Sequence, residues 1–224
     1  MKVKEKLKKI YGFAEKDELT DEQYAWLERF STDRDTFVRS ETASILFQFV
    51  NERAKQILLF LANDKNYFVR VEAYDSLSAF AFAEVALFLQ KKIFTEKNEL
   101  AKGYAILSWA DVTGKLQEKR EAENLEFIEK SMIHDGNDWI PLCWYYAQYR
   151  LGNRECINNI FSCLYSEDYH VRHSAISTLN EFLDPDNCER IRMEIEKVYQ
   201  NETAVSVRDA AMRLLRKTSE IIRM

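Results

Sequence analysis

The sequence predicts an all-α protein built from repeated helical hairpins. Two observations point to this class. Gly (5) and Pro (2) are scarce among the 224 residues, whereas hairpin-rich β folds need both residues at their turns. In addition, a heptapeptide recurs along the chain, as DRDTFVR at 33–39 and DKNYFVR at 64–70. A pattern that returns at such an interval is typical of stacked structural repeats.

Four weaker copies of the heptapeptide follow, and they read EKNELAK at 96–102, DGNDWIP at 135–141, SEDYHVR at 166–172 and ETAVSVR at 202–208. The first position is mostly acidic, the third is mostly Asp or Asn, and the seventh is mostly basic. Ser166 departs from the pattern at the first position and Pro141 at the seventh. The repeat therefore covers the chain from about residue 20 to residue 220.

Each copy is expected to form a turn and to open a helix. The Asp or Asn at the third position is a typical helix N-cap. Apolar or small residues then recur on one helical face, as Val38, Thr42 and Leu46 do in the first copy. Pro141 falls in a first turn, where a missing N–H costs little.

Apolar-periodic segments at 56–64, 84–94, 125–133 and 158–165 precede four of the turns. Each unit is therefore predicted to be a helix, a short acidic turn and a second helix. Residues 1–19 are expected to cap one end of the stack through Val3, Leu7 and Ile10, with lysines such as Lys6 in solvent.

The D-x-[DN]-x-x-V-R turn, with a small residue three positions later and Leu seven positions later, resembles the HEAT repeat. The resemblance implies a right-handed α-solenoid of about six HEAT-like hairpins plus an N-terminal capping helix, in one domain over 1–224. In that family, acidic and basic turn residues form a ladder between neighbouring units. The corresponding residues here are Asp33, Arg39, Asp64, Arg70, Asp168, Arg172 and Arg208.

In HEAT-like solenoids the second helices line the concave face, so the resemblance also suggests a partner surface. The candidate partner-binding residues on these helices are Glu41, Glu72, Asp75, Tyr104, Asp111, Tyr146, Tyr149, Arg150 and Glu181. Acidic side chains steer a basic partner, and clustered aromatic side chains anchor interfaces. The alternatives are a solvated helix face and, for the aromatic cluster, plain packing.

Composition weighs against several other functions. The net charge of −5 and the pI of about 5.4 disfavour nucleic-acid binding through phosphates. Cys143, Cys156, Cys163 and Cys188 form no C-x-x-C pair and are expected to be free thiols in a cytoplasmic protein. The histidines lack zinc-motif spacing. We therefore expect no metal, no cofactor and no catalytic residue, and the chain offers no apolar run that spans a membrane.

The leading hypothesis is a monomeric, non-enzymatic module that binds a partner protein with a basic surface. The resemblance to small bacterial HEAT-repeat proteins suggests a toxin-neutralising immunity protein or an assembly scaffold. The alternative is a HEAT-like enzyme, similar to DNA glycosylases or to bilin lyases. Glycosylases of this kind carry a basic concave face, whereas the face inferred here is acidic over its first half.

Overall fold

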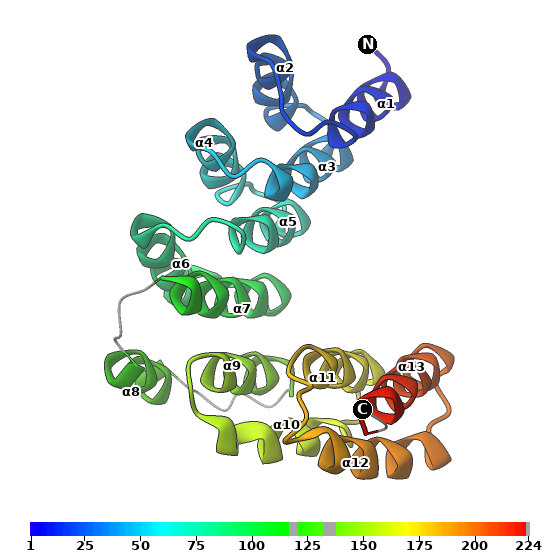
Figure 1. The fold of residues 1–224 in the computed structure, drawn as a ribbon. Coiled ribbons are helices and arrows are strands. Elements are labelled where there is room, and N and C mark those ends of the chain that lie inside the picture. Colours follow the sequence, from blue (N-terminus) through cyan, green and yellow to red (C-terminus); the bar gives the residue numbers. More distant parts are fainter. Residues whose placement is uncertain (117–120, 132–137, 223–224) are drawn as a thin grey trace. The chain divides into compact units, whose positions relative to one another are not determined.

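A computed structural model describes residues 1–116, 121–131 and 138–222 of the chain. Helices account for the regular structure, and these residues form no strand. None of the helices in these ranges has the length and apolar character needed to cross a membrane. The chain divides into two compact units, Met1–Asn124 and Leu125–Met224, and the boundary falls within α8 (Glu121–Ser131) (Figure 1). The predicted all-α class is confirmed.

The first unit consists of short helices joined by turns of a few residues. Their bounds are α1 (Val3–Ala14), α2 (Asp21–Ser31), α3 (Thr36–Ile45), the 3-10 turn η1 (Leu46–Gln48), α4 (Glu52–Leu61), α5 (Tyr67–Leu77), α6 (Ala83–Thr95) and α7 (Glu99–Lys115). The pairs α2/α3, α4/α5 and α6/α7 are hairpins, and each predicted heptapeptide turn joins one pair.

The helices of the first unit stack in two rows (Figure 1). The second helices of the hairpins, α3, α5 and α7, pack side by side, and α1 packs against α3 at the end of this row. Ala73 and Ala105 are fully buried on α5 and α7. Small side chains at these positions allow neighbouring helices to approach closely, while Leu58 and Leu89 of the other row fill the space between the rows.

The second unit repeats this design. Its elements after α8 are α9 (Trp139–Arg150), the 3-10 turn η2 (Arg154–Cys156), α10 (Ile157–Cys163), α11 (Tyr169–Glu181), α12 (Cys188–Asn201) and α13 (Val205–Ile222). Helices α9, α11 and α13 pack in one row, and α10 and α12 pack against them. Pro141 lies in the first turn of α9, where the sequence places it. Asp135 and Asn137, in the turn of the fourth copy, lie outside the described residues.

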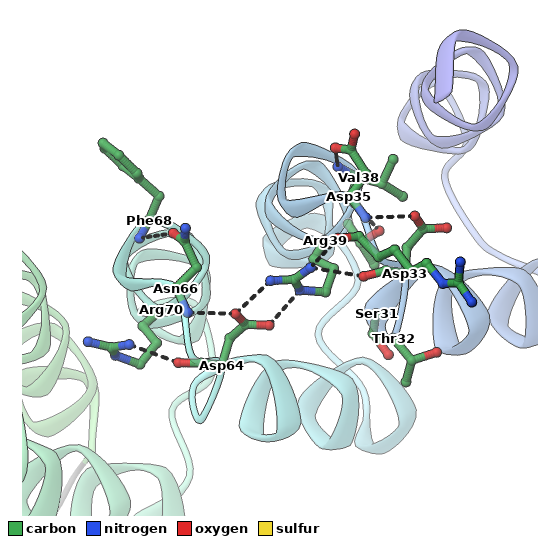
Figure 2. A network of polar contacts seen from close by, with 12 residues as sticks. Ser31, Thr32, Asp33, Asp35, Val38, Arg39, Asp64, Asn66, Phe68 and Arg70 are labelled. Atoms are coloured by element: carbon green, nitrogen blue, oxygen red, sulfur yellow. Dashed lines mark hydrogen bonds and ion pairs between the residues drawn. The ribbon is translucent and has the colours of Figure 1, made fainter. Parts of the chain in front are cut away.

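An arginine–carboxylate ladder joins neighbouring hairpins of the first unit (Figure 2). Arg39 donates from Nε and Nη2 to the two carboxylate oxygens of Asp64, at 2.6 and 2.8 Å. Its Nη1 donates to the backbone carbonyl of Asp33, in its own turn, at 2.9 Å. Arg70 repeats this arrangement with Glu96, at 2.6 Å for both bonds. Each arginine thereby ties its own turn to the next one.

The ladder carboxylates also shape the turns to which they belong. Asp64 accepts the backbone N–H of Asn66 at 2.8 Å, and Asn66 in turn caps α5 by accepting the N–H of Phe68 at 2.9 Å. Burial raises the pKa of Asp64, but the hydrogen bonds from Arg39 and from the Asn66 N–H outweigh that effect and lower it. The side chain is therefore held ionised between two hairpins.

The ladder begins on the capping helix, which differs from the sequence prediction. Lys6 of α1 forms an ion pair with Asp33 and is half-buried, whereas we expected the lysines of this helix in solvent. The N-terminal helix therefore occupies the place of a preceding hairpin and supplies the cation that Asp33 needs.

Among its described residues, the second unit has one complete ladder contact, and the joint before it lacks both charged partners. Arg172 donates to the two carboxylate oxygens of Glu202 at 2.7 and 2.9 Å. Pro141 stands at the basic position of the fourth copy and Ser166 at the acidic position of the fifth, so both charged partners are replaced at this joint. The Ser166 hydroxyl still accepts the N–H of Asp168 at 3.3 Å, which preserves the turn.

Two residues that we predicted to belong to the ladder have other roles. Asp168 is the N-cap of α11 and accepts the N–H of His170 at 2.8 Å. Arg208 belongs to the sixth copy, and its guanidinium lies over the ring of Tyr199 at 5.4 Å. Among the described residues, Arg208 makes no ion pair.

We expect Arg39→Ala to lower the free energy of unfolding by about 3 kcal/mol, because it leaves the Asp64 carboxylate buried without its cation. Arg208→Ala, at the same position of the last copy, is the matched control and should cost less than about 1 kcal/mol. Urea denaturation followed by circular dichroism measures both. Equal losses for the two variants would show that the ladder does not stabilise the fold.

The Arg172–Glu202 contact should make stability depend on pH. Hydrogen bonds from Arg172 lower the pKa of Glu202 from 4.5 to about 2, despite some desolvation. Because the folded pKa is depressed, the stabilisation is complete above about pH 4.5 and disappears as the pH falls towards 2. A shift of this size corresponds to roughly 3 kcal/mol. Melting curves of the wild type and of Glu202→Gln should therefore differ at neutral pH and converge near pH 2.

Candidate functional site

Four of the predicted partner-binding carboxylates lie near one another on the packed second helices of the first unit. They are Glu41 on α3, Glu72 and Asp75 on α5, and Asp111 on α7. We call these four residues the acidic face. Tyr104 lies two helical turns before Asp111 on α7 and is half-buried, so it is placed on the same side of that helix.

The electrostatics of the acidic face show that its members interact. Burial raises the pKa of Glu72, and repulsion by Asp75 and by Glu41 raises it further. Desolvation also raises the pKa of Asp75, and repulsion by Asp111 adds to it. These couplings run from α3 across α5 to α7. The sequence prediction thus grouped four carboxylates that the fold does bring together.

The α1 helix borders the acidic face. The pKa of Tyr11 is raised by partial burial and then by its hydrogen bond and its repulsive interaction with Glu41. The hydroxyl of Tyr11 therefore stays protonated and stabilises the Glu41 carboxylate. By contrast, Glu72 and Asp75 make no ion pair or side-chain hydrogen bond within the described part of the chain. Their oxygens are available to a cationic group from outside.

The aromatic part of the predicted partner surface is internal, contrary to our expectation. Tyr146 and Tyr149 on α9 are only 5% and 3% exposed. The ring of Tyr149 stacks on Phe182 at 4.2 Å, and Tyr146 lies 5.0 Å from the same ring. The Tyr146 hydroxyl donates to Glu181 at 2.8 Å. These contacts join α9 to the end of α11, so the cluster packs the second unit together.

Two further hydrogen bonds complete this contact. We call its residues the aromatic clasp: Tyr146, Tyr149, Glu181, Phe182 and Asn187. The Asn187 amide donates to the hydroxyl of Tyr149 at 3.0 Å and to the carbonyl of Phe182 at 2.8 Å. The sequence indicates that the joint between α9 and α11 differs from the others, because Pro141 and Ser166 replace the two charged ladder residues there. Arg150, which was also predicted to bind the partner, is exposed at the C-terminal end of α9.

The cysteines do not form a reactive site among the described residues. All four are buried and free. Burial raises the pKa of Cys156 and that of Cys163 to about 12, and it raises the pKa of Cys143 as well. A thiol with so high a pKa holds its proton at neutral pH and is a poor nucleophile. No group of three or more His, Cys, Asp or Glu side chains in the described ranges has metal-binding geometry.

Comparisons with known proteins identify the class of fold. The complex of CpcE and CpcF of phycocyanin lyase from Nostoc sp. PCC7120 contains a chain with a TM-score of 0.61 and 13% identity, covering 96% of this chain and 88% of that one. An archaeal HEAT-like repeats protein from Thermococcus onnurineus NA1 has a TM-score of 0.41 and 12% identity, covering 97% and 93%. No protein-family model and no curated protein matches the sequence.

With the stacked hairpins described above, the likeness at a TM-score of 0.61 defines the class of fold. The chain has the fold of HEAT-like helical-repeat proteins, and the resemblance predicted from the heptapeptide is confirmed. The identities are too low to carry a function from the neighbours to this chain. The site itself must supply that argument.

Because the aromatic clasp is internal, Tyr146→Ala combined with Tyr149→Ala should lower the stability of the protein, by about 4 kcal/mol. The two truncations leave a cavity beside Phe182 and remove two hydroxyl contacts. Tyr145→Ala, a half-buried neighbour on the same helix, is the control and should cost clearly less. Thermal melting distinguishes the possibilities, because surface anchors would leave the melting temperature of the double variant unchanged.

Proposed function

We propose that this protein is a non-catalytic interaction module that holds a partner protein with a basic surface on its acidic face. The observation that supports this proposal is the placement of Glu72 and Asp75. Both carboxylates lie on adjacent turns of α5, repel neighbouring carboxylates and make no internal ion pair among the described residues.

Such an arrangement is unfavourable for folding and favourable for binding. The pKa of such a carboxylate is higher in the folded state than in the unfolded state. As the pH rises through these two pKa values, the folded state loses stability, because it resists ionisation of the group. The ionised acidic face therefore costs stability at neutral pH. A lysine or arginine from a partner relieves the repulsion and gains a charge-assisted hydrogen bond. Stability sacrificed in this way is common at functional surfaces.

The acidic face suits a compact basic protein better than a small molecule, because its charges extend over three helices. Neutralising a toxin and holding a subunit during assembly both use such a contact. We propose that a monomer performs this role in the bacterial cytoplasm, a compartment in which four free thiols remain reduced.

The test is a charge reversal of the acidic face, Glu72→Lys with Asp75→Lys. Tagged wild-type protein and the variant are each used to capture proteins from the native host, and captured proteins are identified by mass spectrometry. We expect one or more basic proteins to bind the wild type, to be released as the salt concentration rises, and to bind the variant at least about tenfold more weakly.

The matched control is Asp17→Lys with Glu18→Lys, which makes the same change in charge in the exposed loop between α1 and α2. This variant should capture the same partners as the wild type. The melting temperature of the acidic-face variant should not fall, because the substitutions remove repulsion. If the acidic-face variant keeps every partner of the wild type, the proposed surface is wrong.

A second candidate function, a role in bilin attachment, has one supporting observation. The structural neighbour with the TM-score of 0.61 belongs to the complex of CpcE and CpcF of phycocyanin lyase. Within this chain, the buried thiols disfavour a covalent carrier role for the cysteines. Incubation of the protein with a free bilin and a phycocyanin apoprotein tests this candidate, because attachment shifts the visible absorbance of the bilin.

A further inference from the structure

A second charged surface lies at the turn edge of the first unit. In the first three heptapeptides the second position is an exposed basic residue and the fifth is an exposed apolar residue. We call these six residues the basic–apolar edge: Arg34, Lys65 and Lys97, with Phe37, Phe68 and Leu100. The apolar side chains are 53%, 52% and 37% exposed, which is uncommon for three large apolar residues in one row.

The three apolar residues occupy equivalent places. Each is the second residue of its helix, and Asp35 and Asn66 accept the N–H groups of Phe37 and Phe68 at 2.9 Å. Equivalent backbone settings give the side chains the same starting direction. Figure 2 shows Phe68 projecting away from the ladder residues. The ring of Tyr67 lies 4.2 Å from that of Phe68 and supports it.

The spacing along the edge follows from the helix packing. Because α3, α5 and α7 are direct neighbours, their axes are expected to lie about 8–10 Å apart. The apolar side chains are therefore expected to form a row with about that spacing. A polyproline-like peptide advances about 9 Å for every three residues, so it returns an apolar side chain to each helix in register.

The edge carries more positive than negative charge, because Arg34, Lys65 and Lys97 outnumber the carboxylates of Asp35, the N-cap of α3, and Glu99. The ladder carboxylates Asp33, Asp64 and Glu96 are each matched by a cation within the ladder. The side chains of Arg34, Lys65 and Lys97, by contrast, form no ion pair within 4 Å among the residues described. The N-terminal ends of three helices add partial positive charge at the same edge. An acidic ligand is therefore favoured.

The ladder does not require this composition. In the fifth copy the corresponding positions hold Glu167 and His170, and in the sixth they hold Thr203 and Ser206. The Arg172–Glu202 contact nevertheless forms between these two copies. Basic and apolar residues at these positions are thus a separate property of the first three turns.

We propose that the basic–apolar edge binds an extended acidic peptide segment that carries an apolar side chain at every third residue. Such a segment matches the row of apolar side chains and places carboxylates beside Arg34, Lys65 and Lys97. A membrane surface or a nucleic acid is less suitable, because both extend negative charge beyond one edge. The negative charge of a membrane or a nucleic acid would be repelled by the acidic face of the same unit and by the net charge of −5 of the chain.

The proposal is tested with a fluorescein-labelled peptide of four Leu-Asp-Pro triplets, whose prolines favour the extended form. Fluorescence anisotropy at low salt should detect binding to the wild type. Lys65→Glu with Lys97→Glu, and separately Phe37→Ala with Phe68→Ala, should weaken binding at least about tenfold. A peptide with Asn in place of Asp should bind at least about tenfold more weakly.

Two controls separate the edge from the rest of the surface. Leu87→Ala removes an apolar side chain that is 67% exposed on α6, and Lys16→Glu reverses a charge outside the edge; neither should change binding. The acidic-face variant Glu72→Lys with Asp75→Lys should bind the peptide at least as well as the wild type. This result would hold even if the proposed function of the acidic face failed.

Circular dichroism and thermal melting show whether the edge variants are folded, since all substituted side chains are exposed. The proposal is overturned if the wild type does not bind the acidic peptide or if folded edge variants bind it equally well. It is also overturned if vesicles of anionic lipid or single-stranded DNA bind through these residues while the peptide does not.

Discussion

The bidentate contact between an arginine and the carboxylate of the following turn is the interaction on which the structure depends. Single hairpins cannot bury their apolar faces, so they must stack, and the ladder determines how they stack. The guanidinium of Arg39 holds Asp64 through two bonds and its own turn through a third. Arginine suits this contact better than lysine, because its planar guanidinium binds both oxygens of a carboxylate at once. The contact therefore fixes distance and orientation between neighbouring hairpins.

The joint between the fourth and fifth copies shows what replaces this contact when it is missing. Pro141 and Ser166 remove both charges together, which avoids leaving one buried charge without its partner. The aromatic clasp then joins the same two helices at their other ends, through stacking of Tyr149 on Phe182 and the Tyr146–Glu181 hydrogen bond. Aromatic stacking and area burial supply the stabilisation that the ion pair supplies elsewhere.

The ladder also affects the two surfaces that we propose for binding. The cations and carboxylates of the ladder pair with one another, so the ladder as a whole carries little net charge. The charged side chains outside the ladder therefore decide which partners the first unit attracts. The carboxylates of the acidic face lie along α3, α5 and α7, and the basic side chains of the edge lie in the turns before these helices. One short helical unit thereby presents separate surfaces of opposite charge. A neutral ladder makes this separation possible, because unpaired ladder charges would mix the two potentials.

The sequence alone determined the helical hairpins, the N-caps and the position of the ladder, since these features depend on residues that are close in sequence or that recur at the repeat interval. It also grouped Glu41, Glu72, Asp75 and Asp111, because equivalent positions of stacked helices lie side by side. Only the tertiary structure decided that Tyr146 and Tyr149 are buried, that Lys6 pairs with Asp33 and that Asp168 and Arg208 lie outside the ladder. The burial of the two tyrosines and the pairing of Lys6 depend on neighbours distant in sequence, Phe182 and Asp33. Helical periodicity specifies the face on which a side chain lies, whereas the packed neighbours decide whether that face meets solvent or another helix.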